Sequence, residues 1–112
     1  VVYSLRSRRE FLDFDRARVK HLQPLSEEMV LEFARAARAK LDTTWGIAEL
    51  GAAGPAPTPY GPAAGTSVIG LSGPVELTIQ IETNSADRKA NMLAFTEAAL
   101  NLFGKALSAE SV

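Results

Sequence analysis

The sequence predicts an α/β fold, a three-layer α/β/α sandwich in which helices cover both faces of a mixed sheet. Three observations lead to this prediction. Two stretches repeat apolar residues at helical spacing, and another run alternates apolar and polar residues with the period of a strand. The chain has 112 residues, of which 46% are hydrophobic and 22% charged. These values are ordinary for a folded protein, so we expect residues 1–112 to form a single domain.

The first third of the chain is expected to contain one strand and two helices. Residues 1–5 form a short β-rich run, which predicts a strand. A short helix is expected over residues 7–14, followed by a polar connection over 15–24. The second helix is expected over 27–41, because Ser26 is a good N-cap, glutamates occupy the first turn and apolar residues recur at helical spacing.

Three further strands are expected in the middle of the chain. Residues 43–50 and 66–71 are rich in apolar and β-branched side chains, which predicts two buried strands. Residues 75–82 alternate between apolar and polar side chains, as in a strand with one solvated face. Since the turn at 72–74 is short, the last two strands should be antiparallel.

The chain is expected to end in a helix that is capped by Asn84 or Ser85, with Asp87 in its first turn. The apolar residues of this helix extend well beyond a single stripe, so we expect it to be covered on more than one side. They are Met92, Leu93, Phe95, Ala99, Leu100, Leu102, Phe103, Ala106 and Leu107.

Composition excludes several classes of function. The chain has no cysteine and a single histidine, His21, which rules out thiolate chemistry and a multi-histidine metal site. Twelve basic and thirteen acidic side chains leave a net charge of −1, so nothing draws the chain to nucleic acid or an anionic membrane. No apolar run reaches the roughly 20 residues of a membrane span. We expect no metal, no cofactor, no nucleic acid and no membrane, and a location in the cytoplasm, or in an organelle matrix or stroma if the chain is processed.

Residues 51–65 hold four of the eight glycines and four of the six prolines, which predicts a long loop. The loop opens with Gly51-Ala52-Ala53-Gly54-Pro55, directly after a buried strand. Backbone N–H groups in such a glycine turn can approach an anion closely. The alternative is a tight turn that opens a surface loop, because neither the P-loop nor the dinucleotide pattern is present. Glu49, just before the turn, could position a ligand or cap the amides of the loop.

Basic residues supply two further candidates. Arg88 lies in the first turn of the last helix, where the helix dipole disfavours a cation. This placement indicates an anionic ligand or, as the alternative, a solvated arginine paired with Asp87 or Glu82. A second basic cluster, formed by Arg6, Arg8 and Arg9, has no interleaved aromatic residue and is diluted by acidic neighbours, which favours a solvated face.

Five segments, in their order and spacing, resemble the C-terminal domain of the CinA family of competence-damage-inducible proteins. The family has a V-x-Y-S strand, a V-S-x-E-V helix start, a G-x-A-G-P turn, a G-T-V strand and a G-D-R helix start. The matching segments are Val1-Val2-Tyr3-Ser4, Leu25-Ser26-Glu27-Glu28-Met29-Val30, Gly51-Ala52-Ala53-Gly54-Pro55, Gly65-Thr66-Ser67-Val68 and Asp87-Arg88. Glu49 before the turn is more similar to eukaryotic than to bacterial relatives.

The resemblance implies an amidohydrolase-type domain that acts on nicotinamide mononucleotide and releases ammonia from its carboxamide. A nicotinamide nucleotide is therefore the expected ligand. By the resemblance and the reasoning above, its binding residues should be Tyr3, Ser4, Arg8, Glu49, Gly51, Gly54, Pro55 and Arg88. We expect the turn after Leu50 and the cation at Arg88 to face one shared hollow.

The sequence departs from the family pattern at three points. The family nucleophile comes from an E-S-C-T-G-G-type segment upstream of the V-x-Y-S strand, and this sequence does not contain it. The lysine that usually follows the family tyrosine by five residues is Arg8, which stays protonated and cannot act as a base. The threonine that commonly precedes the hallmark glycine is Leu50. We therefore expect the domain to be catalytically degenerate or incomplete, and the catalytic residues are left unassigned.

The alternative is a non-catalytic interaction or assembly subunit of a larger complex, and a third hypothesis is a nucleotide sensor without chemistry. Both are compatible with a sandwich that lacks the family's first strand and helices. Such a sandwich should expose apolar surface at Val1, Val2, Ile47 and residues 68–69. We therefore expect a companion chain or a homo-oligomer.

Overall fold

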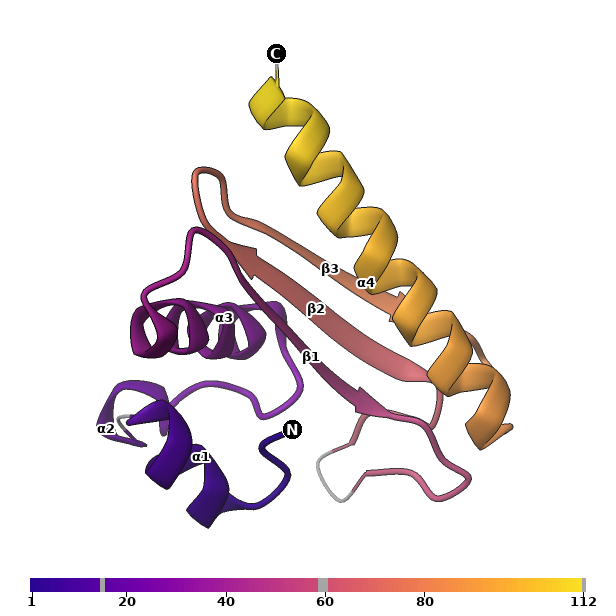
Figure 1. Ribbon diagram of the computed structural model, residues 1–112. Helices are drawn as coiled ribbons and strands as arrows, with labels where there is room; N and C mark the ends of the chain where they lie inside the picture. The colour runs from indigo at the N-terminus through magenta and orange to yellow at the C-terminus, as the bar shows by residue number, and fades with distance from the viewer. Residues whose placement is uncertain (15, 59–60, 112) are drawn as a thin grey trace.

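The computed structural model describes residues 1–14, 16–58 and 61–111 (Figure 1). The described residues form helices and strands in the order α1 Leu5–Leu12, α2 Arg16–Val19, α3 Glu27–Leu41, β1 Gly46–Ala52, β2 Thr66–Ser72, β3 Leu77–Glu82 and α4 Arg88–Ser111. No helix in this part of the chain is both long enough and apolar enough to cross a membrane.

The strands form one sheet in the order β1-β2-β3, with helices on both faces. Figure 1 shows α3 on one side of the sheet and α4 on the other, with the C-terminal end of α4 reaching past the strands. Gly70 of β2 lies against the backbone of α3, whereas its neighbours Ile69 and Leu71 pack with Leu102 and Ala106 of α4. The predicted layered α/β/α class is thus confirmed, and β2 is its buried centre.

The sheet is antiparallel in both described pairings, not mixed. The prediction of a first strand over residues 1–5 is wrong. Ser4 is the N-cap of α1 instead, and its hydroxyl accepts a hydrogen bond from the Ser7 amide at 3.1 Å while the Ser7 hydroxyl accepts one from the Ser4 amide. This reciprocal capping starts a helix from a run whose β propensity finds no partner strand.

The glycine motif begins inside a strand, not in the loop. The strand expected over residues 43–50 runs over Gly46–Ala52 instead, and Gly51 and Ala52 pair with Ser67 and Thr66. The motif's first two residues are therefore held by the sheet. The turn proper starts at Ala53.

The cap of the last helix also differs from the prediction. The side chain of Asp87, not that of Asn84 or Ser85, accepts a hydrogen bond from the Ala90 amide at 3.1 Å. Asn84 has a φ of +58°, in the left-handed region, and follows the end of β3 at Glu82 by two residues. Because a cap must stand three residues before the amide it satisfies, α4 begins at Arg88.

Large apolar side chains are exposed at the N-terminal end of the chain and along α4. Val68 and Ile69 are fully buried, contrary to prediction, because α3 and α4 cover both faces of the central strand. Ile47 and Val1 are exposed as expected. The described chain covers only one side of α4, and it leaves the side chains of Met92, Leu93 and Leu100 exposed by 52%, 64% and 67%.

Candidate functional site

The carboxylate of Glu49 is held in place on the face of β1 that looks toward α4. The Ser67 hydroxyl, which is fully buried, donates a hydrogen bond to Glu49 Oε2 at 2.7 Å. A Cβ atom at position 51 would collide with this carboxylate and would lie 2.9 Å from the Phe95 ring. Glycine is therefore needed at position 51 to leave room for Glu49 and Phe95, which explains a glycine within a regular strand.

The glycine turn is anchored to the start of α4 by Asn91. This side chain is 1% exposed, and its amide group donates hydrogen bonds to the carbonyl oxygens of Ala53 at 2.9 Å and Ser85 at 2.8 Å. Gly54 follows with a φ of +89°, a conformation that side chains disfavour. The turn and the helix start therefore form one unit.

Arg88 links the same two segments from the solvent side. It is the first residue of α4, and its Nη1 donates a hydrogen bond to the Gly54 carbonyl oxygen at 2.9 Å. No ion pair joins Arg88 to Asp87 or Glu82 in the described part of the chain, although the alternative interpretation of the sequence paired Arg88 with one of them. Apart from this bond, the Arg88 guanidinium has no hydrogen-bond or ion-pair partner among the described residues.

A cavity of about 480 Å³ lies between β1 and α4. Its wall contains the carboxylate of Glu49 and the guanidinium of Arg88, and the apolar part of its wall comes largely from α4. The lining residues are Val1, Glu49, Gly51, Ala53, Arg88, Met92, Phe95, Thr96, Ala99 and Leu100. A volume of this size suits a small-molecule ligand.

Of the eight expected binding residues, Glu49, Gly51 and Arg88 line this cavity, and Gly54 adjoins it through its bond to Arg88. Pro55 follows Gly54 through a cis peptide bond and is exposed. Leu50 points to the opposite face of the sheet, as alternation along the strand requires. The expected turn and cation thus border one hollow.

The three N-terminal candidates lie elsewhere. Tyr3 is 90% exposed, and Ser4 caps α1. The Nε of Arg8 donates to the Val2 carbonyl oxygen at 3.1 Å, and its guanidinium lies 5.0 Å from the centre of the Phe33 ring. None of these three residues lines the cavity.

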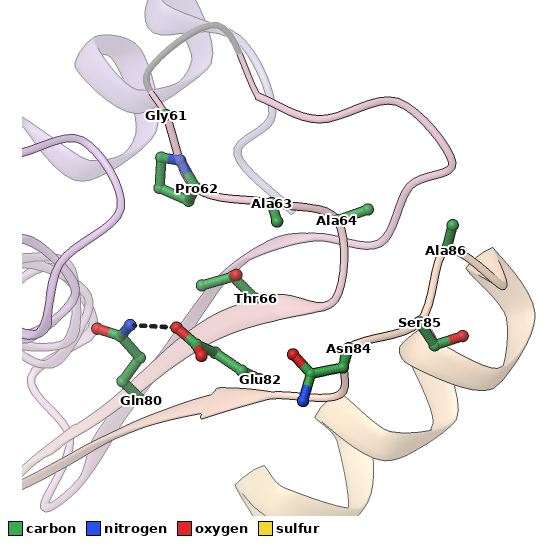
Figure 2. Close-up of a pocket in the computed structure, with 10 residues that line it drawn as sticks. All are labelled: Gly61, Pro62, Ala63, Ala64, Thr66, Gln80, Glu82, Asn84, Ser85 and Ala86. Carbon is green, nitrogen blue, oxygen red and sulfur yellow. Dashed lines mark hydrogen bonds between the residues drawn. The ribbon is translucent and has the colours of Figure 1, made fainter.

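A second cavity, of about 640 Å³, is lined by the 61–64 segment, by β2 and β3, and by the residues that lead to α4 (Figure 2). Figure 2 shows Gln80 and Glu82 of β3 side by side, with Asn84 and Ser85 leading toward α4. Among the described residues that line it, Glu82 is the only charged one, so they offer no cation to an anionic ligand. Elsewhere, no group of three or more potential metal ligands occurs among the described residues.

Two supporting residues, Ser67 and Asn91, were not singled out from the sequence. Each is a polar side chain at a fully buried position, Ser67 in the central strand and Asn91 in the first part of α4. Such a residue needs a hydrogen-bond partner when it is buried, which is the signal that could have identified both. Their partners lie 18 and 38 residues away in the chain, and only the fold reveals them.

The fold and the cavity together define an α/β/α domain with a candidate site for a small anionic molecule. Residues 1–107 match the family model of the CinA C-terminal domain. The chain therefore belongs to the CinA C-terminal domain family.

Solved structures of the CinA superfamily share this fold. A protein from Klebsiella pneumoniae has 22% identity and a TM-score of 0.85 over 96% of this chain and 68% of its own. One from Escherichia coli has 20% identity and a TM-score of 0.80 over 90% of this chain and 59% of its own. One from Enterobacter cloacae has 27% identity and a TM-score of 0.69 over 91% of this chain and 63% of its own. The chain thus spans about three fifths to two thirds of these relatives, and no curated protein matches it.

Proposed function

We propose that this CinA-type domain binds a nicotinamide nucleotide, with Arg88 and the glycine turn holding the phosphate. The observation that carries this proposal is the position of Arg88. It stands in the first turn of α4 against the helix dipole, it is bound only to the Gly54 carbonyl oxygen among the described residues, and it lines a cavity. Guanidinium groups are well suited to phosphate because they present several donors in one plane.

The nicotinamide part of the proposal comes from the resemblance to CinA-type amidohydrolases. Hydrolysis of an amide requires a nucleophile, a group that activates it and donors for the oxyanion. The hydroxyl of Thr96, which lines the cavity, already donates to the Met92 carbonyl oxygen at 2.8 Å. Arg8 occupies the family's lysine position and lies outside the cavity. We therefore propose that the domain is catalytically degenerate, or incomplete without further residues.

Two measurements on the full-length protein test this proposal. In calorimetric titration, nicotinamide mononucleotide should bind, whereas nicotinamide riboside, which lacks the phosphate, should bind at least about tenfold more weakly. Equal affinity for the two would overturn phosphate binding.

Ammonia release from nicotinamide mononucleotide separates the two forms of the catalytic proposal. Turnover by the full-length protein indicates a domain that is incomplete by itself, and its absence, with binding intact, indicates a degenerate one. Turnover by residues 1–112 alone would contradict both.

A second candidate function is that of an interaction or assembly subunit, either in a homo-oligomer or with a companion chain. The exposed leucines of α4, Leu93 and Leu100, favour it, because contiguous apolar side chains on a helix usually mark a contact surface. This role and nucleotide binding are compatible.

A further inference from the structure

We infer that Glu49 determines the specificity of the cavity, because it accepts a hydrogen bond from a donor group on a ligand whose anionic end is held by Arg88. The cavity then selects molecules that carry an anion and an O–H or N–H donor together. This inference rests on the proposed function and adds to it the chemistry of the second half of the ligand.

The carboxylate of Glu49 is exposed on β1 and is oriented by one hydrogen bond from the protein. Ser67 holds one of its oxygens, Oε2, at 2.7 Å, and the missing side chain of Gly51 gives the carboxylate its place next to Phe95. Ser67 is itself fixed, because it is fully buried in the central strand. Such a preorganised acceptor loses little conformational freedom when a ligand binds.

The charges of the cavity point to a ligand with two different ends. Glu49 and Arg88 line the same cavity, yet no ion pair forms between them. Glu49 Oε1 accepts no hydrogen bond within the described residues, and Arg88 uses only Nη1. A ligand that is only anionic meets repulsion from Glu49, and one that is only cationic meets repulsion from Arg88.

A nicotinamide nucleotide offers two groups that fit this acceptor, the ribose hydroxyls and the carboxamide N–H. Both groups are hydrogen-bond donors to a carboxylate. The two possibilities differ in the expected preference between nucleotides, because nicotinic acid mononucleotide has a carboxylate in place of the carboxamide, whereas its ribose is unchanged. A carboxylate that faced Glu49 would be repelled.

The test compares Glu49→Gln with the unchanged full-length protein in calorimetric titrations with nicotinamide mononucleotide and nicotinic acid mononucleotide. Glutamine has nearly the same shape and can still accept from Ser67, but it turns an amide group toward the ligand. We expect Glu49→Gln to bind nicotinamide mononucleotide about tenfold more weakly, or weaker still, than the unchanged protein. Glu10→Gln, an exposed change on α1, should leave both affinities unchanged.

The pattern of losses identifies the donor. If the carboxamide faces Glu49, the unchanged protein prefers nicotinamide mononucleotide and Glu49→Gln removes the preference. If both nucleotides bind more weakly by the same factor, Glu49 faces a part that they share, the ribose hydroxyls or the cationic pyridinium ring, and not the carboxamide. Glu49→Asp, which keeps the charge but retracts it by one methylene, should weaken binding as well and serves as the second variant if the glutamine protein does not fold.

Equal affinities of Glu49→Gln and the unchanged protein would overturn this inference. If Arg88→Gln nevertheless weakens binding of the nucleotide, the proposed phosphate site stands and only the role of Glu49 is lost. If the unchanged protein binds neither nucleotide, both the proposed function and this inference fail.

Discussion

Asn91 shows how single side chains hold the site together. Its amide group donates to Ala53 in the glycine turn and to Ser85 before α4, and its oxygen accepts from the Thr83 hydroxyl. Ala53 lies in the glycine turn, and Thr83 and Ser85 lie in the connection from β3 to α4, so Asn91 joins these two segments at the start of α4. Asn91 therefore fixes the position from which Arg88 reaches the turn.

We expect Asn91→Ala to lower the free energy of unfolding by about 2–4 kcal/mol, because it leaves buried carbonyl groups and a hydroxyl without partners. Urea denaturation measures this change. Asn101→Ala, at an exposed position of the same helix, is the matched control and should have little effect. Similar losses in both variants would show that the network of Asn91 is unimportant.

At the residue scale, the sequence predicted the groups with a local signature and missed the others. Arg88 was identifiable because the helix dipole makes a cation unusual in a first turn. Glu49 was noticed only for its place before the turn. Its partner Ser67 lies on the neighbouring strand, and a strand pairing across a long loop is not visible in local sequence.

At the scale of elements, α3 is tied to the segment before β3 by a pair of charges. Arg35 Nε donates to Glu76 Oε2 at 2.9 Å, and Arg35 Nη2 to Glu76 Oε1 at 2.6 Å. The Arg35 guanidinium, with help from the Ser72 hydroxyl, lowers the pKa of Glu76 from 4.5 to about 2, although burial opposes the shift. The bridge fixes α3 over the sheet.

Glu76→Gln should lower stability by about 1 kcal/mol near neutral pH, a modest value because both side chains are partly exposed. A carboxylate whose pKa is lowered by folding stabilises the protein above its unfolded pKa of 4.5, and this contribution disappears as the pH falls toward 2. The difference between the variant and the unchanged protein should therefore shrink over this range in urea denaturation. A difference that is independent of pH would contradict the role of the bridge.

Elements with strong local signals were predicted well. The bounds of α3 match because Ser26 caps it and its apolar stripe is regular, and the alternation along β3 is equally local. The prediction of a strand over residues 1–5 failed because β propensity alone does not make a strand without a neighbouring strand to pair with. The start of α4 was misplaced because Asn84, Ser85 and Asp87 are all acceptable caps, and tertiary contacts decide between them.

At the scale of the whole molecule, one side of α4 carries apolar side chains that the described chain leaves exposed. Met92, Leu93 and Leu100 form an exposed apolar surface on α4, which we call the α4 face. The α4 face adjoins the candidate cavity, since Met92 and Leu100 belong to this face and also line the cavity. A partner on this face would also shape one wall of the site.

Leu100→Glu should weaken self-association of the full-length protein and lower its mass in sedimentation equilibrium toward that of a single chain. The charge would be buried without a partner in such an interface, which is costly. Asn101→Glu is the matched control, because it lies about 100° around the helix from the α4 face. A single-chain mass for the unchanged protein at high concentration would exclude the homo-oligomer.

The central claim is that Arg88 and the glycine turn hold the phosphate of a nucleotide, and calorimetric titration of Arg88→Gln with nicotinamide mononucleotide tests it most directly. We expect this variant to bind about 10- to 100-fold more weakly than the unchanged full-length protein. Arg6→Gln, an exposed change on α1, should bind normally. Equal affinity in Arg88→Gln, Arg6→Gln and the unchanged protein would contradict the account.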